Sequence, residues 1–309
     1  MKRNPVFPIT VALLLLSLTL SPAFALEIPQ HDNIVFSAST FRQDIPSAFG
    51  LYKNETVADY SSFQVKMPSG LEDKKADFKE GNLVYAPLDN LYVGVKKTST
   101  HLEGTTRAWD STSDEYGFQY KLKESEDQKS AMAFSYRQRT INLKPITIKA
   151  TGFVDTVFTS KGKWDSVGFV MSRHLDLQKG IHYSLESAKI KYANLSSTTN
   201  KLGVGFDYVP NIKNPKLKLE ANLIVFKNSI QSINQMLSGR LIYNVGKGIN
   251  LSFDGAAFMK GMAVGGTRFS DNGMGSMIFD PAVLPDTIKK FQDKRFGYWG
   301  VSLTYGIRF

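Results

Sequence analysis

The stretch that decides the fold is Phe296-Gly-Tyr-Trp-Gly-Val-Ser-Leu-Thr-Tyr-Gly-Ile-Arg-Phe309. Alternate side chains of an extended strand point to opposite faces. One face of this stretch therefore carries a continuous apolar row, and the other carries mostly small or polar side chains. The apolar row consists of Trp299, Val301, Leu303, Tyr305, Ile307 and Phe309. A soluble edge strand with such a face would invite aggregation, so the pattern favours a strand between lipid and a wet lumen.

A terminal Phe that closes such a strand resembles the C-terminal signal of Gram-negative outer-membrane β-barrels. The resemblance implies that the six residues of the apolar row form an assembly signal, which the barrel assembly machinery recognises. It also implies a place in the cell outer membrane. An ordinary amphipathic strand at the end of a soluble β domain is the alternative.

The other end of the chain has the features of a secretory signal peptide. Lys2 and Arg3 form a positive region, an apolar run extends from Val11 to Leu20, and Ala23-Phe24-Ala25 is a cleavage site of the small-x-small type. We therefore expect residues 1–25 to be a signal peptide and residues 26–309 to be the barrel domain. The apolar run is too short for a helix that spans a bilayer.

Composition narrows the remaining classes. The chain has no Cys, which excludes disulfides, thiolate catalysis and Cys-based metal sites. Its net charge is +10, and the export signal argues against nucleic acid as the partner. Lipopolysaccharide in the outer-membrane lipid, an anionic solute or an acidic polysaccharide suits this charge better.

The breaks between apolar-alternating segments follow a regular order. Short breaks at 86–90, 123–129, 176–180, 210–215 and 246–248 alternate with longer ones at 99–114, 139–164, 193–199, 227–236 and 260–296. This order predicts an all-β fold: a closed antiparallel up-and-down transmembrane β-barrel of about twelve strands. Either Asn33 to Phe41 or Ala58 to Met67 opens it. The rest of residues 26–60 is then a periplasmic or lumen-filling segment.

Two hairpin pieces, Leu83 to Leu91 and Tyr120 to Phe134, resemble the hairpin style of the YjbH-like exopolysaccharide outer-membrane proteins. The shared features are a Pro-Leu-Asp turn and an acidic turn before a strand of small residues. The chain lacks the Pro that the family has after the acidic turn. The resemblance implies a role beside surface polysaccharide.

Charged residues at the positions opposite the apolar rows should line the lumen, because Lys or Arg on the lipid face costs about 2–4 kcal/mol at the midplane. This predicts a lumen with more basic than acidic side chains. The predicted lumen-lining residues are Lys96, Lys121, Arg137, Glu186, Lys201, Asp207, Lys218, Glu220, Arg240, Asp254 and Arg308.

We expect a pore or channel for small or glycan-like solutes. One alternative is a non-conducting barrel that supports surface polysaccharide assembly or export. The other is a lipid- or lipopolysaccharide-modifying enzyme, for which His101 is the only candidate at the outer end. We expect no enzyme activity, no catalytic residue, no cofactor and no metal site; His174 and His182 flank one turn but have no carboxylate at ligand-like spacing.

Overall fold

A computed structural model describes residues 45–66, 75–103, 107–144, 146–148, 153–155, 161–192, 195–228, 234–258 and 296–308. Within these ranges no helix has the length and hydrophobicity needed to cross a membrane. The described strands are β1 (Glu55–Lys66), β2 (Lys75–Leu88), β3 (Leu91–Glu103), β4 (Arg107–Glu124), β5 (Ser130–Leu143), β6 (Ile146–Ile148), β7 (Phe153–Asp155), β8 (Lys161–His174), β9 (Lys179–Tyr192), β10 (Leu195–Tyr208), β11 (Leu217–Asn228), β12 (Asn234–Gly246), β13 (Ile249–Phe258) and β14 (Phe296–Arg308).

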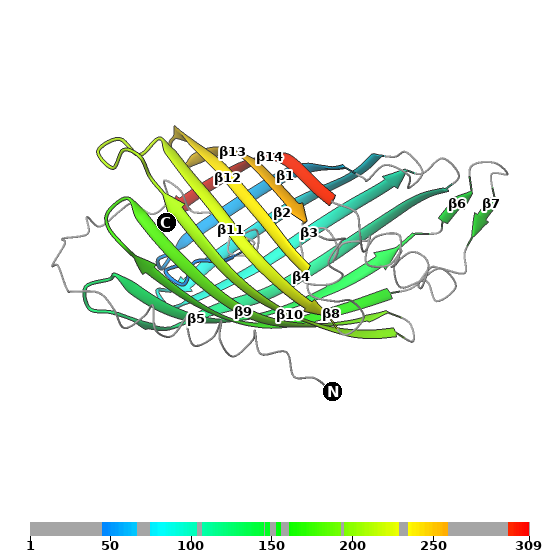
Figure 1. Ribbon diagram of the computed structural model, residues 1–309, viewed down its shortest axis with the longest axis horizontal. Helices are drawn as coiled ribbons and strands as arrows, with labels where there is room; N and C mark the ends of the chain where they lie inside the picture. The colour runs from blue at the N-terminus through cyan, green and yellow to red at the C-terminus, as the bar shows by residue number, and fades with distance from the viewer. Residues whose placement is uncertain are drawn as a thin grey trace.

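Twelve of these strands form a closed cylinder (Figure 1). Each pairs antiparallel with its neighbours, and β14 returns to pair with β1 from Glu55–Arg308 to Lys66–Gly297. The pairing of β3 with β4 completes the ring. This confirms the predicted fold class and strand number. The first strand of the ring includes Ala58 to Lys66; the alternative opener, Asn33 to Phe41, lies outside the described residues.

The outer connections are shorter than the sequence predicted. The strands β3 and β4 occupy most of the predicted loop 99–114, and β5 and β8 reach to Leu143 and back to Lys161 within the predicted loop 139–164. The predicted loop 193–199 is likewise mostly strand, and β11 and β12 extend into both ends of the predicted loop 227–236. These strand ends lie beyond the apolar band, where the outward face is no longer held to apolar residues, so the alternation expected of a lipid-facing strand disappears although the backbone ladder continues. The pair β6–β7 projects past the barrel wall (Figure 1).

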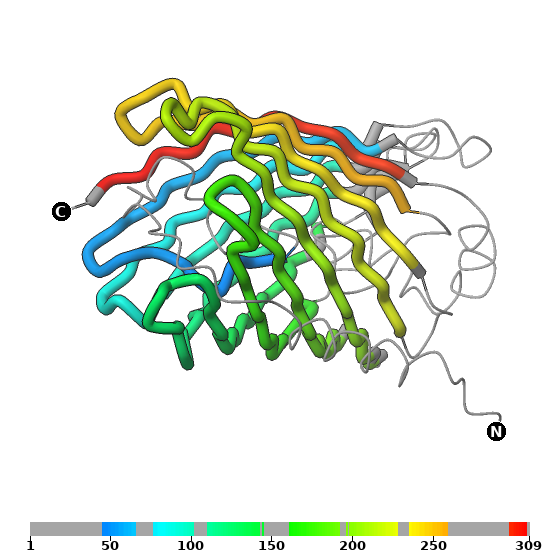
Figure 2. The backbone as a smooth tube through the Cα atoms, turned by 60° about the vertical axis from the view of Figure 1, so that its left-hand side comes forward, coloured from blue at the N-terminus to red at the C-terminus, as the bar shows by residue number. Residues whose placement is uncertain are grey.

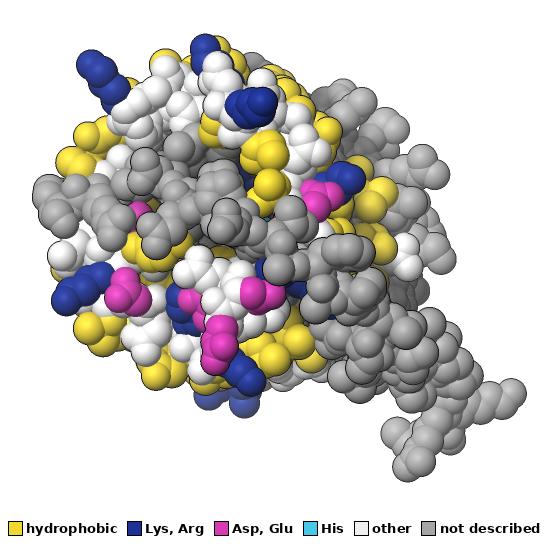
Figure 3. Space-filling view, turned by 90° about the vertical axis from the view of Figure 1, so that its left-hand side faces the viewer, with side chains coloured by type: hydrophobic (Ala, Val, Ile, Leu, Met, Phe, Trp, Pro, Cys, Tyr) yellow, Lys and Arg dark blue, Asp and Glu magenta, His cyan; other side chains and the backbone are white. Residues whose placement is uncertain are grey.

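The outward face carries an apolar band. On β14 the side chains of Trp299, Val301, Leu303 and Tyr305 are 45–57% exposed, whereas the intervening Ser302 is 5% exposed. Hydrophobic side chains also appear around the circumference when the barrel is viewed from the end that carries the short turns (Figure 3). An apolar exterior around a closed antiparallel wall is the arrangement that lipid requires. The protein is therefore a transmembrane barrel.

Five short connections lie together at one end, which is the left-hand end in Figure 1. The tightest is Gly246-Lys247-Gly248, where all three residues have positive φ and glycine at two of them avoids a Cβ clash. In the connection between β4 and β5, hydrogen bonds from the Ser125 hydroxyl and the Lys129 backbone N–H lower the pKa of the Asp127 carboxyl.

Short turns face the periplasm in barrels of this kind, so we expect this end of the barrel to lie on the periplasmic side. Protease added to intact cells is therefore expected to spare the 246–248 turn and to cut between β13 and β14, in residues 260–295. Immunoblotting of the fragments measures this. Cleavage at 246–248 in cells whose periplasmic proteins remain intact would invert the orientation.

Candidate functional site: the barrel interior

The inward-facing side chains form layers along the barrel axis. A belt of ionised and polar groups occupies the middle of the wall, aromatic and aliphatic groups lie toward the outer end, and the segment 45–51 lies against the inner wall near the short turns. The smooth trace in Figure 2 shows this first described segment beside the strands, in dark blue.

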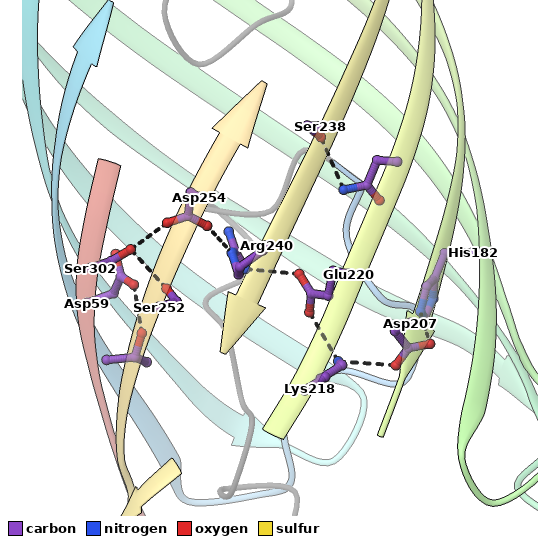
Figure 4. Close-up of polar contacts among 12 residues, drawn as sticks. Asp59, His182, Asp207, Lys218, Glu220, Ser238, Arg240, Ser252, Asp254 and Ser302 are labelled. Atoms are coloured by element: carbon purple, nitrogen blue, oxygen red, sulfur yellow. Dashed lines mark hydrogen bonds and ion pairs between the residues drawn. The ribbon is translucent and has the colours of Figure 1, made fainter. Parts of the chain in front are cut away.

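One run of the belt follows β9 to β14 (Figure 4). Arg240 lies between two carboxylates and donates hydrogen bonds to both Asp254 and Glu220. The Lys218 Nζ lies 3.1 Å from Glu220 Oε1 and 3.2 Å from Asp207 Oδ2. Cations and anions therefore alternate from strand to strand, and each cation offsets the desolvation of its neighbours.

The other run of the belt centres on Glu115 of β4. Arg139 forms a two-nitrogen hydrogen-bonded pair with this carboxylate, and Lys96 Nζ lies 3.9 Å from it and 3.1 Å from Glu80. The second Arg of β5, Arg137, lies 2.9 Å from Glu186. The groups around Glu115 are almost fully buried except Arg137: Glu115 is 2% exposed and Lys96 is 3% exposed.

A carboxylate that accepts several hydrogen bonds completes the belt near the seam of the barrel. Asp59 of β1 accepts hydrogen bonds from the Thr304 hydroxyl at 2.9 Å, the Asn82 amide at 3.2 Å and the Ser61 hydroxyl at 3.1 Å. On the other side of β14, the Ser302 hydroxyl donates to Asp254 at 2.6 Å. Hydroxyls of the closing strand therefore bind carboxylates on both neighbouring sides.

Most predicted lumen residues lie in this belt. The belt brings together Lys96, Arg137, Glu186, Lys201, Asp207, Lys218, Glu220, Arg240 and Asp254. Lys121 lies apart, beside the turn after β4, and pairs with Glu124 at 2.7 Å. The backbone of Arg308 pairs in β14, but its side chain is outside what the structure describes.

Four belt residues were missed from the sequence: Asp59, Glu80, Glu115 and Arg139. Glu80, Glu115 and Arg139 each lie one or two residues from the end of a predicted strand, and Asp59 lies in the N-terminal region, within the candidate opening strand Ala58 to Met67. Extending the alternation two residues past the predicted strand ends would have found Glu80, Glu115 and Arg139. Among described residues the belt holds six basic and seven acidic side chains, so the expected basic excess is wrong.

The outer part of the interior is apolar, which the sequence analysis did not predict. Phe63 and Phe78 stack at 4.5 Å between ring centroids, and Tyr298 meets them edge-on at 5.8 and 5.9 Å. Trp164, Phe226, Met236 and Phe258 are also buried at this level. Tyr298 therefore lies inside the wall, because it shares a face with Ser302 and Thr304 and not with the lipid-facing Trp299.

The segment 45–51, here called the N-terminal strap, touches widely separated strands. Its backbone makes three hydrogen bonds to inward side chains: Ala48 N–H donates to Ser172 of β8 at 2.8 Å, and the carbonyls of Ser47 and Phe49 accept from Gln119 of β4 at 2.8 Å and Tyr92 of β3 at 2.9 Å. The strap therefore spans part of the interior and is fixed at several points.

Packing holds the strap as well. Ala48 is fully buried against Ala131, Ala133 and Val170, and the Phe49 ring stacks on His174 at 4.2 Å. Gly50 has φ +62°, and a Cβ there would lie 1.9 Å from Cζ of Tyr92. Only glycine leaves room for the aromatic ring at this position, which indicates that the strap packs specifically against the wall.

The Ser172 contact continues into the belt. His182 Nδ1 lies 2.8 Å from Ser172 Oγ, and His182 Nε2 lies 3.2 Å from Asp207 Oδ1. Serine, histidine and aspartate in this order are the elements of a nucleophilic triad. Here Ser172 Oγ accepts the Ala48 N–H and Asp207 is paired with Lys218, so the three groups connect the strap to the charged belt.

The remaining histidine candidates do not form a site. His101 lies on the outside of β3 and pairs with Asp110 at 2.7 Å, with both side chains about half exposed. The His174 ring stacks on Phe49. In the part of the chain that the structure describes, no group of three His, Cys, Asp or Glu side chains is placed to hold a metal.

Comparison with known proteins matches no family model and no curated protein. Solved structures with the same fold include the β domain of the Bordetella autotransporter BrkA, at 12% identity over 82% of this chain and 99% of that one, with a TM-score of 0.50. The translocator domain of the autotransporter NalP from Neisseria meningitidis is 9% identical over 82% of this chain and 88% of that one, with a TM-score of 0.49. The KdgM porin in complex with disordered oligogalacturonate is 8% identical over 81% of this chain and 98% of that one, with a TM-score of 0.45.

The BrkA β domain shares its fold with this chain, which has a closed antiparallel wall with an apolar exterior. The protein is thus a closed transmembrane barrel whose mid-section is lined by polar and charged side chains. The similarity of its hairpins to YjbH-like proteins stays a sequence-based expectation.

Proposed function

We propose that the protein is a narrow outer-membrane pore for small polar solutes, which the N-terminal strap closes near its periplasmic mouth. The observation that carries the proposal is the combination of a charged belt around the wall with a strap fixed across the same interior. A charged belt provides hydrogen-bonding partners for a hydrated solute, and a strap held by three backbone contacts can move without breaking the barrel.

The belt also indicates which solutes suit the pore. Because its cations and anions alternate and nearly balance, their fields cancel over short distances and discriminate weakly between anions and cations. Uncharged polar solutes such as short glycans fit such a wall better than the anions that the predicted basic excess favoured.

A second function is favoured by a different observation. The belt side chains around Glu115 are almost completely shielded from solvent, as expected of a filled interior. A barrel that stays closed would act as a scaffold, for example in the assembly or export of surface polysaccharide. The two functions differ in whether displacing the strap produces a conducting path.

A reversible crosslink separates them. The double substitution Ala48→Cys with Ser172→Cys puts a thiol on each of two contacting residues, whose backbone N and side-chain Oγ lie 2.8 Å apart, in a chain that has no other cysteine. In planar bilayers we expect the oxidised protein to show almost no channel events. Reduction should raise the open fraction at least about tenfold, because removing about 1.4 kcal/mol from the stability of the closed form changes the equilibrium by a factor of ten.

The control is the single substitution Ala48→Cys, whose conductance should not respond to reductant. A double variant that conducts equally when oxidised and reduced would show that the path does not pass the strap. If neither form conducts, and deletion of residues 45–51 does not produce channels either, the scaffold function is correct and the pore is not.

A further inference from the structure

Four lysines cluster on the outside of the barrel, away from the interior site. Lys161 and Lys163 lie on β8, and Lys189 and Lys191 lie on the adjacent β9. All four are exposed and face away from the lumen, because the alternate residues between them, such as Trp164 and Ile190, are buried inside the wall.

The strand register brings their charges together. Lys163 lies directly opposite Lys191 in the antiparallel pair, and like charges in this position destabilise a sheet. Lys189 lies opposite Asp165, but that carboxylate accepts a hydrogen bond from Gln138 at 2.8 Å on its other side. Among the described residues none of the four lysines forms an ion pair, so the cluster keeps a net positive charge.

The cluster lies just above the apolar band. Val167 of β8 and Leu185 of β9 face lipid and are 46% and 49% exposed. At about 3.3 Å per residue, Lys163 lies roughly 13 Å along β8 from Val167, toward the end opposite the short turns. That distance places the ammonium groups at the level of the outer-leaflet headgroups.

We propose that this lysine cluster binds the phosphate groups of lipid A, the membrane anchor of lipopolysaccharide. Several ammonium groups at one height attract a ligand that carries more than one phosphate, and lipid A presents its phosphates at the headgroup level with acyl chains below. The apolar surface around Val167 and Leu185 then receives the acyl chains while the lysines bind the phosphates. The bound anion also relieves the repulsion between Lys163 and Lys191.

The position of the lysine cluster beside a lipid-facing surface, together with its charge, favours a phosphate-bearing lipid over a soluble anion. A soluble anion could approach the lysines but would leave the apolar surface below them to other lipids. A glycan solute in the lumen cannot reach the cluster, because the wall separates them. Lipid binding and conduction are therefore independent properties of this barrel.

The test compares two variants of the full barrel in detergent micelles. In the cluster variant Lys161, Lys163, Lys189 and Lys191 are all changed to Gln. In the control variant the four exposed lysines Lys53, Lys213, Lys216 and Lys247 at the opposite end are changed to Gln, so both lose the same charge. Native mass spectrometry counts bound lipid across titrations with bisphosphorylated lipid A, monophosphoryl lipid A and phosphatidylglycerol.

We expect the cluster variant to bind bisphosphorylated lipid A at least about tenfold more weakly than wild type, since each lysine near an anionic surface contributes measurably. The control variant should bind as wild type does. Wild type should prefer two phosphates to one, and both to phosphatidylglycerol. Equal binding by the two variants would overturn the proposal, and so would equal binding of phosphatidylglycerol and lipid A by wild type.

Discussion

Replacing Glu115 with Gln should destabilise the barrel by about 3–5 kcal/mol, the usual cost of removing one partner from a buried ion pair. The substitution preserves side-chain size, so the effect measures charge. It leaves Arg139 and Lys96, both at most 3% exposed, without the carboxylate that lies between them. The free energy of unfolding, from urea titration in lipid vesicles followed by tryptophan fluorescence, measures the loss.

The adjacent residue supplies the control. Asp114 lies on the outer face of the same strand and is exposed, so Asp114→Asn should change stability by no more than about 0.5 kcal/mol. Adding Arg139→Met to Glu115→Gln removes the guanidinium that has lost its carboxylate partner, and should recover part of the lost free energy of unfolding. If the double variant is no more stable than Glu115→Gln alone, the cost does not arise from uncompensated charge.

Replacing Leu303 with Arg should cost about 2–4 kcal/mol, because the guanidinium would enter the lipid near the midplane of the bilayer. Leu303 is 49% exposed on the outer face of β14, where it neighbours Tyr60 of β1 and Leu251 of β13 in the register. The amount of heat-modifiable, folded barrel in outer-membrane fractions and the urea midpoint in vesicles both measure the effect.

The same substitution at Gln64 is the matched control. Gln64 is an exposed residue of β1 that lies opposite Trp299, at the outer edge of the apolar band. Arg at the interface costs about 0–1 kcal/mol, so Gln64→Arg should fold nearly as well as wild type. Equal losses at the two positions would contradict the assignment of the outer face of β14 to lipid.

The fold could be predicted from the sequence because lipid imposes a rule on every second residue. The apolar row of β14 and the regular order of short and longer breaks were sufficient to predict a closed barrel of about twelve strands. The strand ends could not be predicted, since β3, β4, β5 and β8 continue beyond the lipid, where the outward face no longer has to be apolar.

The interior was harder to predict because the lumen does not impose one chemistry. The mid-section follows the expected polar pattern, but Phe63, Phe78 and Tyr298 pack inside near the outer end. Ion pairing across strands depends on register, and a shift of one residue moves a side chain to the other face. The pairing of Glu115 with both Arg139 and Lys96 therefore became visible only with the structure.

The strap had no sequence signal of its own. Residues 45–51 were expected only to belong to a periplasmic or lumen-filling segment, because they show neither alternation nor a turn motif. Their position depends on three-dimensional fit, such as the space that Gly50 leaves for the Tyr92 ring. Contacts of this kind join residues that are far apart in the chain, and no local pattern encodes them.

The pairing of β1 with β14 has a consequence for how the protein forms. The partners Glu55 and Arg308 are separated by nearly the whole described chain, and the entropic cost of bringing distant segments together must be met before their hydrogen bonds form. Hairpins such as β12–β13 can assemble early, but the seam can join only late. Until it does, two unsatisfied strand edges stay open, which makes this seam the step at which a chaperone or a catalyst of insertion has most to contribute.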